Sequence, residues 1–296
     1  MRLKKAICIL LAALLSALIL CSCEGFSWDM LFGSQTESAP LMSVHFLDVG
    51  QGDAIFVELP DDKTMLIDSG ENYHGEGIIN YIRDCGSKRI DYLIGTHPHS
   101  DHIGSMPYII RNFEIGKIYM PEAGANSKLY EELLNAVKKK NRVVHPGKAG
   151  VKLINEDDLK VYMLAPVTID EDNLNNSSII LKIEYLDSSF LFMADAELAE
   201  IDSVKLDMSA DVIKIGHHGS RTSTTEALLD KVKPQIAVIS VGADNVYGHP
   251  AGSVLKLLNK YGCYVYRTDL DGTVTITSDG EELHIYTGGV SIERAR

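Results

Sequence analysis

The sequence is poor in cysteine and contains no internal repeat. Of five cysteines, only Cys85 and Cys263 lie beyond residue 23, and no pair has zinc-finger spacing, which excludes a cysteine-based zinc domain. Two cysteines so far apart can form one disulfide in an oxidising compartment or remain buried thiols, and the sequence leaves both open. The lack of any period of roughly 20 to 50 residues excludes a solenoid or a propeller.

Basic residues are also scarce. The chain has 28 lysines and arginines against 41 aspartates and glutamates, which gives a formal net charge of -13. Such a surface repels polyanions at long range, so a general basic face for nucleic acid is excluded. We expect any contact with nucleic acid to be local, through metal ions and a confined basic rim.

The N-terminus has the features of an export signal. The positively charged start Met1–Lys5 precedes an apolar stretch, Ala6–Leu20. Leu20–Cys23 resembles the bacterial lipoprotein signal, which implies that Cys23 is lipidated and holds the protein at the outer side of the cell membrane. An uncleaved membrane anchor is the alternative. The predicted parts are a signal peptide at 1–23, a flexible tether at 24–41 and a hydrolase domain at 42–296.

Beyond residue 41 the hydrophobic pattern alternates between strand and helix periods. Three strand-like runs joined by tight turns come first, at 42–50, 51–59 and 64–70. We expect further strands at 90–95, 117–120, 151–154, 159–165, 178–185, 189–193, 212–216, 236–241, 264–267, 273–277 and 283–286, and helices at 77–86, 103–113, 127–140, 196–206, 225–231 and 253–261. Two mixed sheets with helices outside, a four-layer αββα sandwich of the α/β (α+β) class, accommodate these elements.

The loop Thr96–Gly104 concentrates metal-ligand side chains. His97, His99, Asp101 and His102 lie within six residues, directly after an apolar strand. Alternate side chains of an extended segment point the same way, so His97 and His99 can converge on one cation while Asp101 and His102 turn to another. Imidazole and carboxylate ligands suit zinc, manganese or iron. An exposed polar loop with incidental histidines is the alternative.

Two later strands end in further candidate ligands. Asp195 follows the apolar run 190–194, and His217 and His218 follow the run 212–216. Strand ends of one sheet share an edge, so these side chains can complete a two-metal site. Asp195 could instead cap the helix that follows it. Adjacent residues on a strand face opposite ways, so only one of the two histidines easily reaches a given ion.

These motifs resemble those of the metallo-β-lactamase superfamily. The resemblance implies that Asp195 bridges two metal ions. It also implies that His217 completes the second metal, which Asp101 and His102 hold. Asp68, at the end of an early strand, is then expected to orient the metal loop from beneath.

The first metal lacks a ligand that is common in this superfamily, a third histidine beside His97 and His99. Between the metal loop and Asp195 the sequence offers only His145, in what the pattern predicts to be a surface turn. At the matching place stand residues 173–178, which are rich in asparagine and serine. The first site is therefore expected to be weak, exchangeable, or completed by water or an amide oxygen.

An ordered series of motifs narrows the resemblance to the metallo-β-lactamase-like domain of the ComEC family of competence proteins, over about residues 43–288. The membrane channel of that family has no counterpart here, so the resemblance does not imply DNA uptake itself. In chain order the motifs are Asp48–Ala54, Leu66–Gly70, the metal loop, Asn175–Ser178, Ala194–Glu197, Gly216–Ser220, Ser240–Gly242 and Tyr247–Pro250.

A site with two divalent cations, zinc or manganese, indicates hydrolysis by a metal-bound hydroxide. We expect a phosphodiesterase or nuclease whose substrate is a phosphodiester such as DNA; no protein partner is predicted. The alternatives are hydrolysis of a cell-envelope phosphoester or of a small ester, lactone or lactam, and a binding protein that has lost turnover. Candidate catalytic residues are Asp101, His218 and His249, the last of which could instead be a structural turn residue; candidate substrate contacts are Ser220, Asn245 and Asn176.

Overall fold

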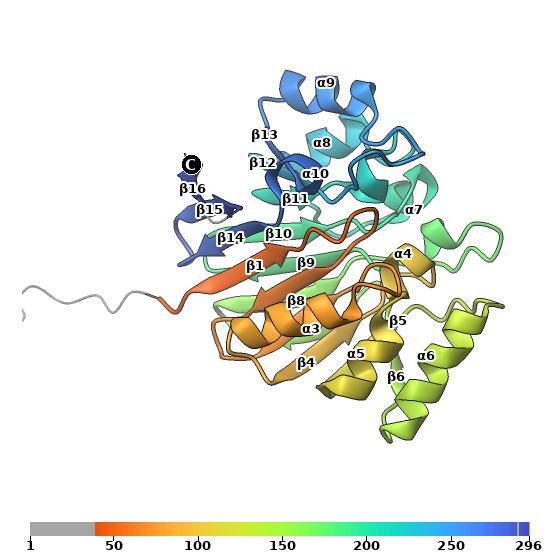
Figure 1. Cartoon of the computed structure of the whole chain (residues 1–296). Helices are drawn as coiled ribbons and strands as arrows, with labels where there is room; N and C mark the ends of the chain where they lie inside the picture. The colour runs from red at the N-terminus through yellow and green to blue at the C-terminus, as the bar shows by residue number, and fades with distance from the viewer. Residues whose placement is uncertain (1–38, 289, 296) are drawn as a thin grey trace, which may run out of the picture. The chain divides into compact units, whose positions relative to one another are not determined.

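The computed structural model describes residues 39–288 and 290–295 (Figure 1). The predicted signal peptide at 1–23, with Cys23, and the predicted tether up to residue 38 lie outside the described residues. Within the described ranges, no helix is both long enough and apolar enough to cross a membrane. Cys85 and Cys263 are free and partly buried. They form no disulfide with each other, so they are two separate thiols.

A sheet of nine strands forms one half of the domain, in the order β16-β15-β14-β1-β2-β3-β4-β5-β6. The first three strands pair antiparallel, as the sequence predicts, and β3 to β6 continue in parallel. The strands are β1 (Met42–Phe46), β2 (Ile55–Glu58), β3 (Thr64–Ile67), β4 (Arg89–Ile94), β5 (Glu114–Met120), β6 (Val144–Pro146), β14 (Val274–Ser278), β15 (Leu283–Thr287) and β16 (Val290–Ala295). His145 lies on edge strand β6, so the predicted surface turn there is wrong.

A second sheet has seven strands, in the order β13-β12-β11-β10-β9-β8-β7. Strands β10 to β13 are parallel, whereas β7 to β10 form antiparallel hairpins. The strands are β7 (Lys152–Asn155), β8 (Leu159–Met163), β9 (Leu181–Tyr185), β10 (Ser188–Phe192), β11 (Val212–Lys214), β12 (Ile236–Ile239) and β13 (Tyr264–Arg267).

Three apolar layers hold these elements together. The inner faces of the two sheets share one core, in which the rings of Phe46 and Phe192 lie 6.1 Å apart. Apolar faces of α3, α5 and α6 cover the outer side of the first sheet, and α7, α8 and α9 cover the second. The arrangement confirms the predicted αββα sandwich. The helices are α3 (Gly75–Asp84), α4 (Ser100–Ile103), α5 (Met106–Asn112), α6 (Lys128–Lys139), α7 (Leu198–Ser203), α8 (Glu226–Val232), α9 (Gly252–Lys260) and α10 (Thr268–Asp271), with 3₁₀ turns η1 (Leu174–Ser177) and η2 (Gly216–Gly219).

The second half of the metal loop and the residues after it, 100–112, differ from the prediction of one helix at 103–113. They form two short helices, α4 and α5, that meet at Gly104 and Ser105. Gly104 packs so closely against the backbone after β3 that a Cβ at this position would come within 2.6 Å of the Asn72 nitrogen. This close approach fixes α4, and with it the metal loop, against the end of β3.

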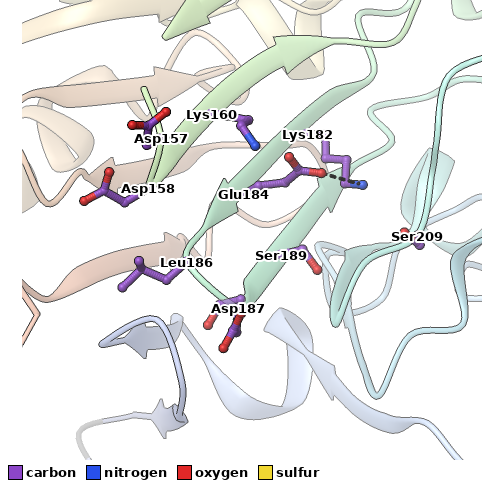
Figure 2. A pocket seen from close by; sticks show the side chains of 10 residues that line it. Asp157, Asp158, Lys160, Lys182, Glu184, Leu186, Asp187, Ser189 and Ser209 are labelled. Atoms are coloured by element: carbon purple, nitrogen blue, oxygen red, sulfur yellow. Dashed lines mark ion pairs between the residues drawn. The ribbon is translucent and has the colours of Figure 1, made fainter. Parts of the chain in front are cut away.

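The β9–β10 hairpin carries a polar pocket of about 220 Å³ (Figure 2). Lys182 is buried beside it and pairs with Glu184 at 3.0 Å and with Asp207 at 2.9 Å. The hairpin turn lies at the start of β10, whereas Asp195 follows the end of that strand. The pocket is therefore separate from the strand ends that carry the candidate ligands.

Candidate metal centre

The metal loop follows β4, includes α4 and is anchored by Asp68. The Thr96 backbone N–H donates to one Asp68 oxygen at 2.8 Å, and its hydroxyl donates to the other at 2.6 Å. The same carboxylate accepts a 2.8 Å hydrogen bond from His102 Nδ1. Asp68 thereby fixes the tautomer of His102 and leaves its Nε2 free for a cation.

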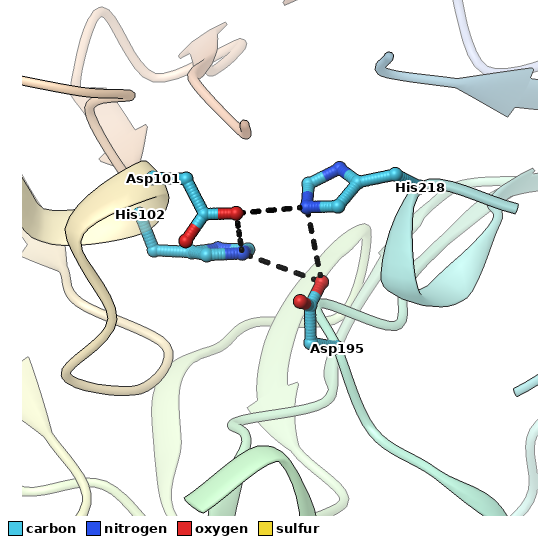
Figure 3. A group of neighbouring side chains, drawn as sticks. All are labelled: Asp101, His102, Asp195 and His218. Atoms are coloured by element: carbon cyan, nitrogen blue, oxygen red, sulfur yellow. Dashed lines mark ion pairs between the residues drawn. The ribbon is translucent and has the colours of Figure 1, made fainter. Parts of the chain in front are cut away.

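Four side chains, of which all but Asp101 are buried, surround one point between the two sheets (Figure 3). His102 Nε2 lies 3.3 Å from Asp195 Oδ1. His218 Nε2 lies 3.3 Å from Asp101 Oδ2 and 3.6 Å from the same Asp195 oxygen. We call Asp101, His102, Asp195 and His218 the second-metal group.

The second-metal group fits a divalent cation. His102 Nε2, His218 Nε2 and Asp195 Oδ1 are buried and have no hydrogen-bond partner. Buried polar atoms are normally hydrogen-bonded, so three orphaned atoms facing one point indicate a cation there. Two nitrogens and two carboxylates are a donor set that zinc or manganese accepts.

The consecutive histidines His217 and His218 do not take the places that the sequence predicted for them. The prediction placed His217 on the second metal, with Asp101 and His102. The structure brings His218 to that pair instead. The prediction assumed a strand in which neighbours face opposite ways, but β11 ends at Lys214. His217 and His218 both have left-handed backbone, with φ of 50° and 53°, in η2. This turn directs both imidazoles toward Asp195.

His217 faces the other oxygen of the bridging carboxylate. Its Nε2 lies 3.7 Å from Asp195 Oδ2, and His97 Nε2 lies 4.0 Å from the same oxygen. His99 Nδ1 is 3.0 Å from His97 Nε2. We call His97, His99, Asp195 and His217 the first-metal group.

A carboxylate orients His217 from behind. Glu197 Oε1 lies 3.3 Å from His217 Nδ1, and Asn173 Nδ2 donates to Glu197 Oε2 at 2.8 Å. A carboxylate on one imidazole nitrogen, with the other nitrogen turned inward, is typical of metal-ligating histidines. Sequence reasoning missed Glu197, although its place two residues after Asp195 was a usable signal.

Charges in the centre reinforce one another. Burial disfavours protonation of His218, but Asp195 and Asp101 outweigh it and raise the pKa of His218 to about 9. Burial also opposes ionisation of Asp101, yet His102 above all holds the pKa of that carboxyl well below its usual range. Asp101 and Asp195 therefore stay ionised at neutral pH, and a cation bound there would replace imidazole protons.

A buried ion pair behind His218 was also missed by sequence reasoning. Lys214 is 0% exposed, and its Nζ lies 2.5 Å from Asp53 Oδ2. The other Asp53 oxygen lies 3.4 Å from His218 Nδ1, which also lies 3.0 Å from the Ser240 carbonyl oxygen. Burial raises the pKa of Asp53, but the neighbouring cation of Lys214, together with His218 and His102, outweighs it and lowers the pKa to about 2. A lysine within the apolar run of β11 was the signal for this pair.

The candidate substrate contacts are mostly engaged in holding the backbone. The Asn245 amide donates to the carbonyls of Gly242 and His249 and accepts from the His249 N–H. Ser220 is buried, with its hydroxyl 3.0 Å from that of Thr222. These contacts give Asn245 and Ser220 a part in loop structure, and their role as substrate contacts stays a prediction.

Asn176 and His249 differ from that pair because each keeps a buried polar atom without a partner. Asn176 donates to Asp170, but its Oδ1 has no partner. His249 Nδ1 has none either, and the ring lies 5.7 Å from that of His217. Burial, with His217 and His218, lowers the pKa of His249. His249 therefore faces the centre as a neutral imidazole at pH 7.

Known proteins resemble the chain in sequence and in fold. ComE operon protein 3 of Bacillus subtilis is 33% identical over 251 residues, which cover 78% of this chain and 32% of the relative. Ribonuclease J of Synechocystis is 31% identical over 91 residues, 28% of this chain and 13% of the relative. The crystal structure of CmlA, a diiron beta-hydroxylase from Streptomyces venezuelae, superimposes with a TM-score of 0.54 at 16% identity, over 80% of this chain and 54% of that one.

These matches have different weight. The likeness to CmlA shows the fold alone. The chain spans about a third of the length of ComE operon protein 3. The competence relative agrees with the predicted ComEC-like branch. The sequence model of the metallo-beta-lactamase superfamily matches residues 47–243, from the end of β1 to the loop after β12. A match of this extent, on a chain folded as an αββα sandwich, shows that the protein belongs to the metallo-β-lactamase superfamily.

Proposed function

We propose that the protein is a metal-dependent phosphodiesterase that cleaves nucleic acid outside the cytoplasmic membrane. The observation that carries the proposal is the position of Asp195, whose two oxygens face two different groups of imidazoles. Such a carboxylate can bridge two cations, and paired cations suit the in-line displacement at a phosphodiester.

The chemistry divides between the cations and the chain. Two divalent cations supply positive charge for a phosphoryl oxygen and lower the pKa of water. Asp195 and the surrounding imidazoles fix the spacing of the two groups, and Asp68 and Glu197 fix the ring orientations. Its lowered pKa makes His249 neutral at pH 7, so it offers a hydrogen bond to a phosphate oxygen at the rim rather than acting as a general acid.

The relatives support a phosphodiester, and the charge of the protein limits where it can bind. With a formal net charge of -13, the protein attracts no polyanion at long range, so affinity has to arise where cations offset the centre's carboxylates. The relatives include a competence operon protein and a ribonuclease. We extend a nucleic-acid substrate to this chain on that basis.

The location proposed for the enzyme depends on Cys23. A lipidated Cys23 would hold the domain at the outer face of the membrane, where nucleic acid arrives from outside. Labelling of producing cells with a palmitate analogue tests this. We expect label on the wild type and none on Cys23→Ser; equal labelling of both would contradict the proposed anchor.

Hydrolysis is tested with the full chain in detergent, loaded with manganese or zinc. Single-stranded DNA, double-stranded DNA and bis-p-nitrophenyl phosphate are the substrates, and Asp195→Asn is the control because it removes the bridging charge. We expect cleavage by the wild type and a loss of at least about 100-fold in Asp195→Asn. No cleavage of any of the three would refute the proposal.

Adding a carboxylic ester and a lactone to these substrates separates the alternatives. Turnover of a carboxylic ester or lactone, with no phosphodiester cleaved, would indicate a small-molecule hydrolase, which the acidic surface also permits. Two bound metal equivalents support an enzyme, whereas no bound metal under metal-replete conditions, without turnover of any substrate, would indicate a binding protein.

A further inference from the structure

The loop between β12 and α9 places exposed apolar side chains beside the metal centre. Val246 is 92% and Tyr247 68% exposed. One face of the Tyr247 ring stacks on His249, with 5.8 Å between centroids and 23° between planes. His249 in turn contacts His217, whose ring centroid is 5.7 Å away. Tyr247 is thus joined to the first-metal group through a single ring.

This loop is held in place without any ligand. The Asn245 amide bonds to the backbone on both sides of Tyr247, at Gly242 and at His249. Pro250 packs against Gly219, where a Cβ would lie 2.5 Å from the proline Cβ. An aromatic ring fixed before the ligand arrives is a low-entropy binding surface.

We propose that the outer face of Tyr247 stacks a nucleobase of single-stranded nucleic acid while the neighbouring phosphodiester lies at the metal centre. The Tyr247 ring packs on His249 with one face, and its other face is free for a base to stack on, as in the aromatic platforms of proteins that bind single strands. In a duplex the bases are already stacked inside the helix, so Tyr247 selects single strands. The inference rests on the proposed phosphodiesterase function.

Charge near the loop fits the same substrate. Arg221 is exposed and directly follows Ser220 at the end of the η2 turn, which carries His217 and His218. Its guanidinium is close enough to contribute, after burial and the two neighbouring imidazoles, to the lowered pKa of His249. A cation here suits the phosphate backbone of a strand whose base lies on Tyr247.

Dinucleotides that lack one base test the inference. The manganese-loaded full chain is given thymidine dinucleotide and the two analogues in which a tetrahydrofuran replaces one base. We expect one analogue to show a KM roughly 5- to 150-fold higher, since base–aromatic stacking has about that effect on binding. Tyr247→Ala should raise the KM for the intact dinucleotide by a similar factor and abolish the difference between substrates.

Matched variants separate stacking from a loss of structure. Tyr247→Phe keeps the aromatic face and should behave as the wild type. Tyr264→Ala removes another exposed tyrosine, 60% exposed at the start of β13, and should change nothing. A second measurement needs no turnover: an oligonucleotide carrying 2-aminopurine should be quenched on binding by the wild type and not by Tyr247→Ala.

Two results would overturn the inference in distinguishable ways. Cleavage of all three dinucleotides with equal KM, or an unchanged KM in Tyr247→Ala, refutes the stacking role and leaves the phosphodiesterase standing. Failure of the wild type to cleave any nucleic acid, intact or abasic, refutes both proposals.

Discussion

Replacement of each consecutive histidine by alanine should remove a different metal ion. His217 faces Asp195 Oδ2 at 3.7 Å with His97, whereas His218 faces Asp195 Oδ1 at 3.6 Å with His102. His217→Ala should therefore weaken the first metal and spare the second, and His218→Ala should do the reverse. Loss of an outer hydrogen-bond partner of a ligand typically costs about 10–100-fold in metal affinity, so we expect loss of the ligand itself to cost at least about 100-fold.

The stability of the metal-free variants should differ as well. The His218 side chain is 2% exposed and lies between Asp53 and Ser240, whereas that of His217 is 24% exposed. His218→Ala leaves Asp53 Oδ1 without its imidazole neighbour, so it should reduce the free energy of unfolding by about 1–3 kcal/mol. We expect His217→Ala to stay within about 1 kcal/mol of the wild type.

The assay is metal analysis of dialysed protein, with titration of the metal-free form against a competing chelator. Asp101→Ala identifies the affected site, because Asp101 belongs to the second-metal group. If His217 serves the first metal, the double variant His217→Ala/Asp101→Ala loses both equivalents. His284→Ala, a half-exposed histidine on β15, is the control and should keep two.

The opposite result would return His217 to the role that the sequence predicted. If His217→Ala and Asp101→Ala weakened the same equivalent, and the double variant still held one ion tightly, the division of the histidines described above would be wrong.

Three further changes probe the supports of the centre. Lys214→Met removes the cation that pairs with buried Asp53 and leaves that carboxylate only imidazoles, above all His218, as charged neighbours, so we expect a loss of at most about 3–5 kcal/mol in urea unfolding of the metal-free protein. The loss should be largely recovered in Lys214→Met/Asp53→Leu, and an unchanged midpoint would contradict the buried pair. Gly52→Ala places a Cβ 2.3 Å from the Asp101 carbonyl oxygen at a φ of +137°. It should lower the free energy of unfolding by about 1–3 kcal/mol and weaken metal binding. Gly77→Ala on α3, with open space around it, is the control and should not lower the free energy of unfolding. Removal of metal by a chelator should lower the free energy of unfolding by about 2.7 kcal/mol when the free metal had been 100 times its Kd; equal melting curves with and without metal would show that the ions do not bind the folded state preferentially.

The strand-end argument found most of the centre from sequence. Asp195 and His218 follow β10 and β11 of the second sheet, and the metal loop follows β4 of the first. Hydrophobic period and a polar residue at its end are local properties, so they can be read without a structure. The αββα layers were predictable for the same reason, since alternating strand and helix periods leave few ways to bury every apolar face.

What sequence could not supply depends on backbone conformation and on distant partners. His217 and His218 form a left-handed turn in place of the assumed strand, and a pair of histidines does not predict such a turn. Lys214 and Asp53 are 161 positions apart, so their pairing appears only once the sheets pack. Asn245 reads as a polar substrate contact in sequence, yet its amide is used up by backbone groups of its own loop.

The centre exists only where the two sheets meet, which couples metal binding to their packing. The first sheet supplies the metal loop and Asp68, and the second supplies Asp195 and the histidines of η2. Asp53 and Lys214 pair across this boundary and are both buried. Because Asp195 lies in both metal groups, a shift of one sheet against the other would disturb both ions together. Binding of either ion should therefore favour binding of the other, through the packing that both require.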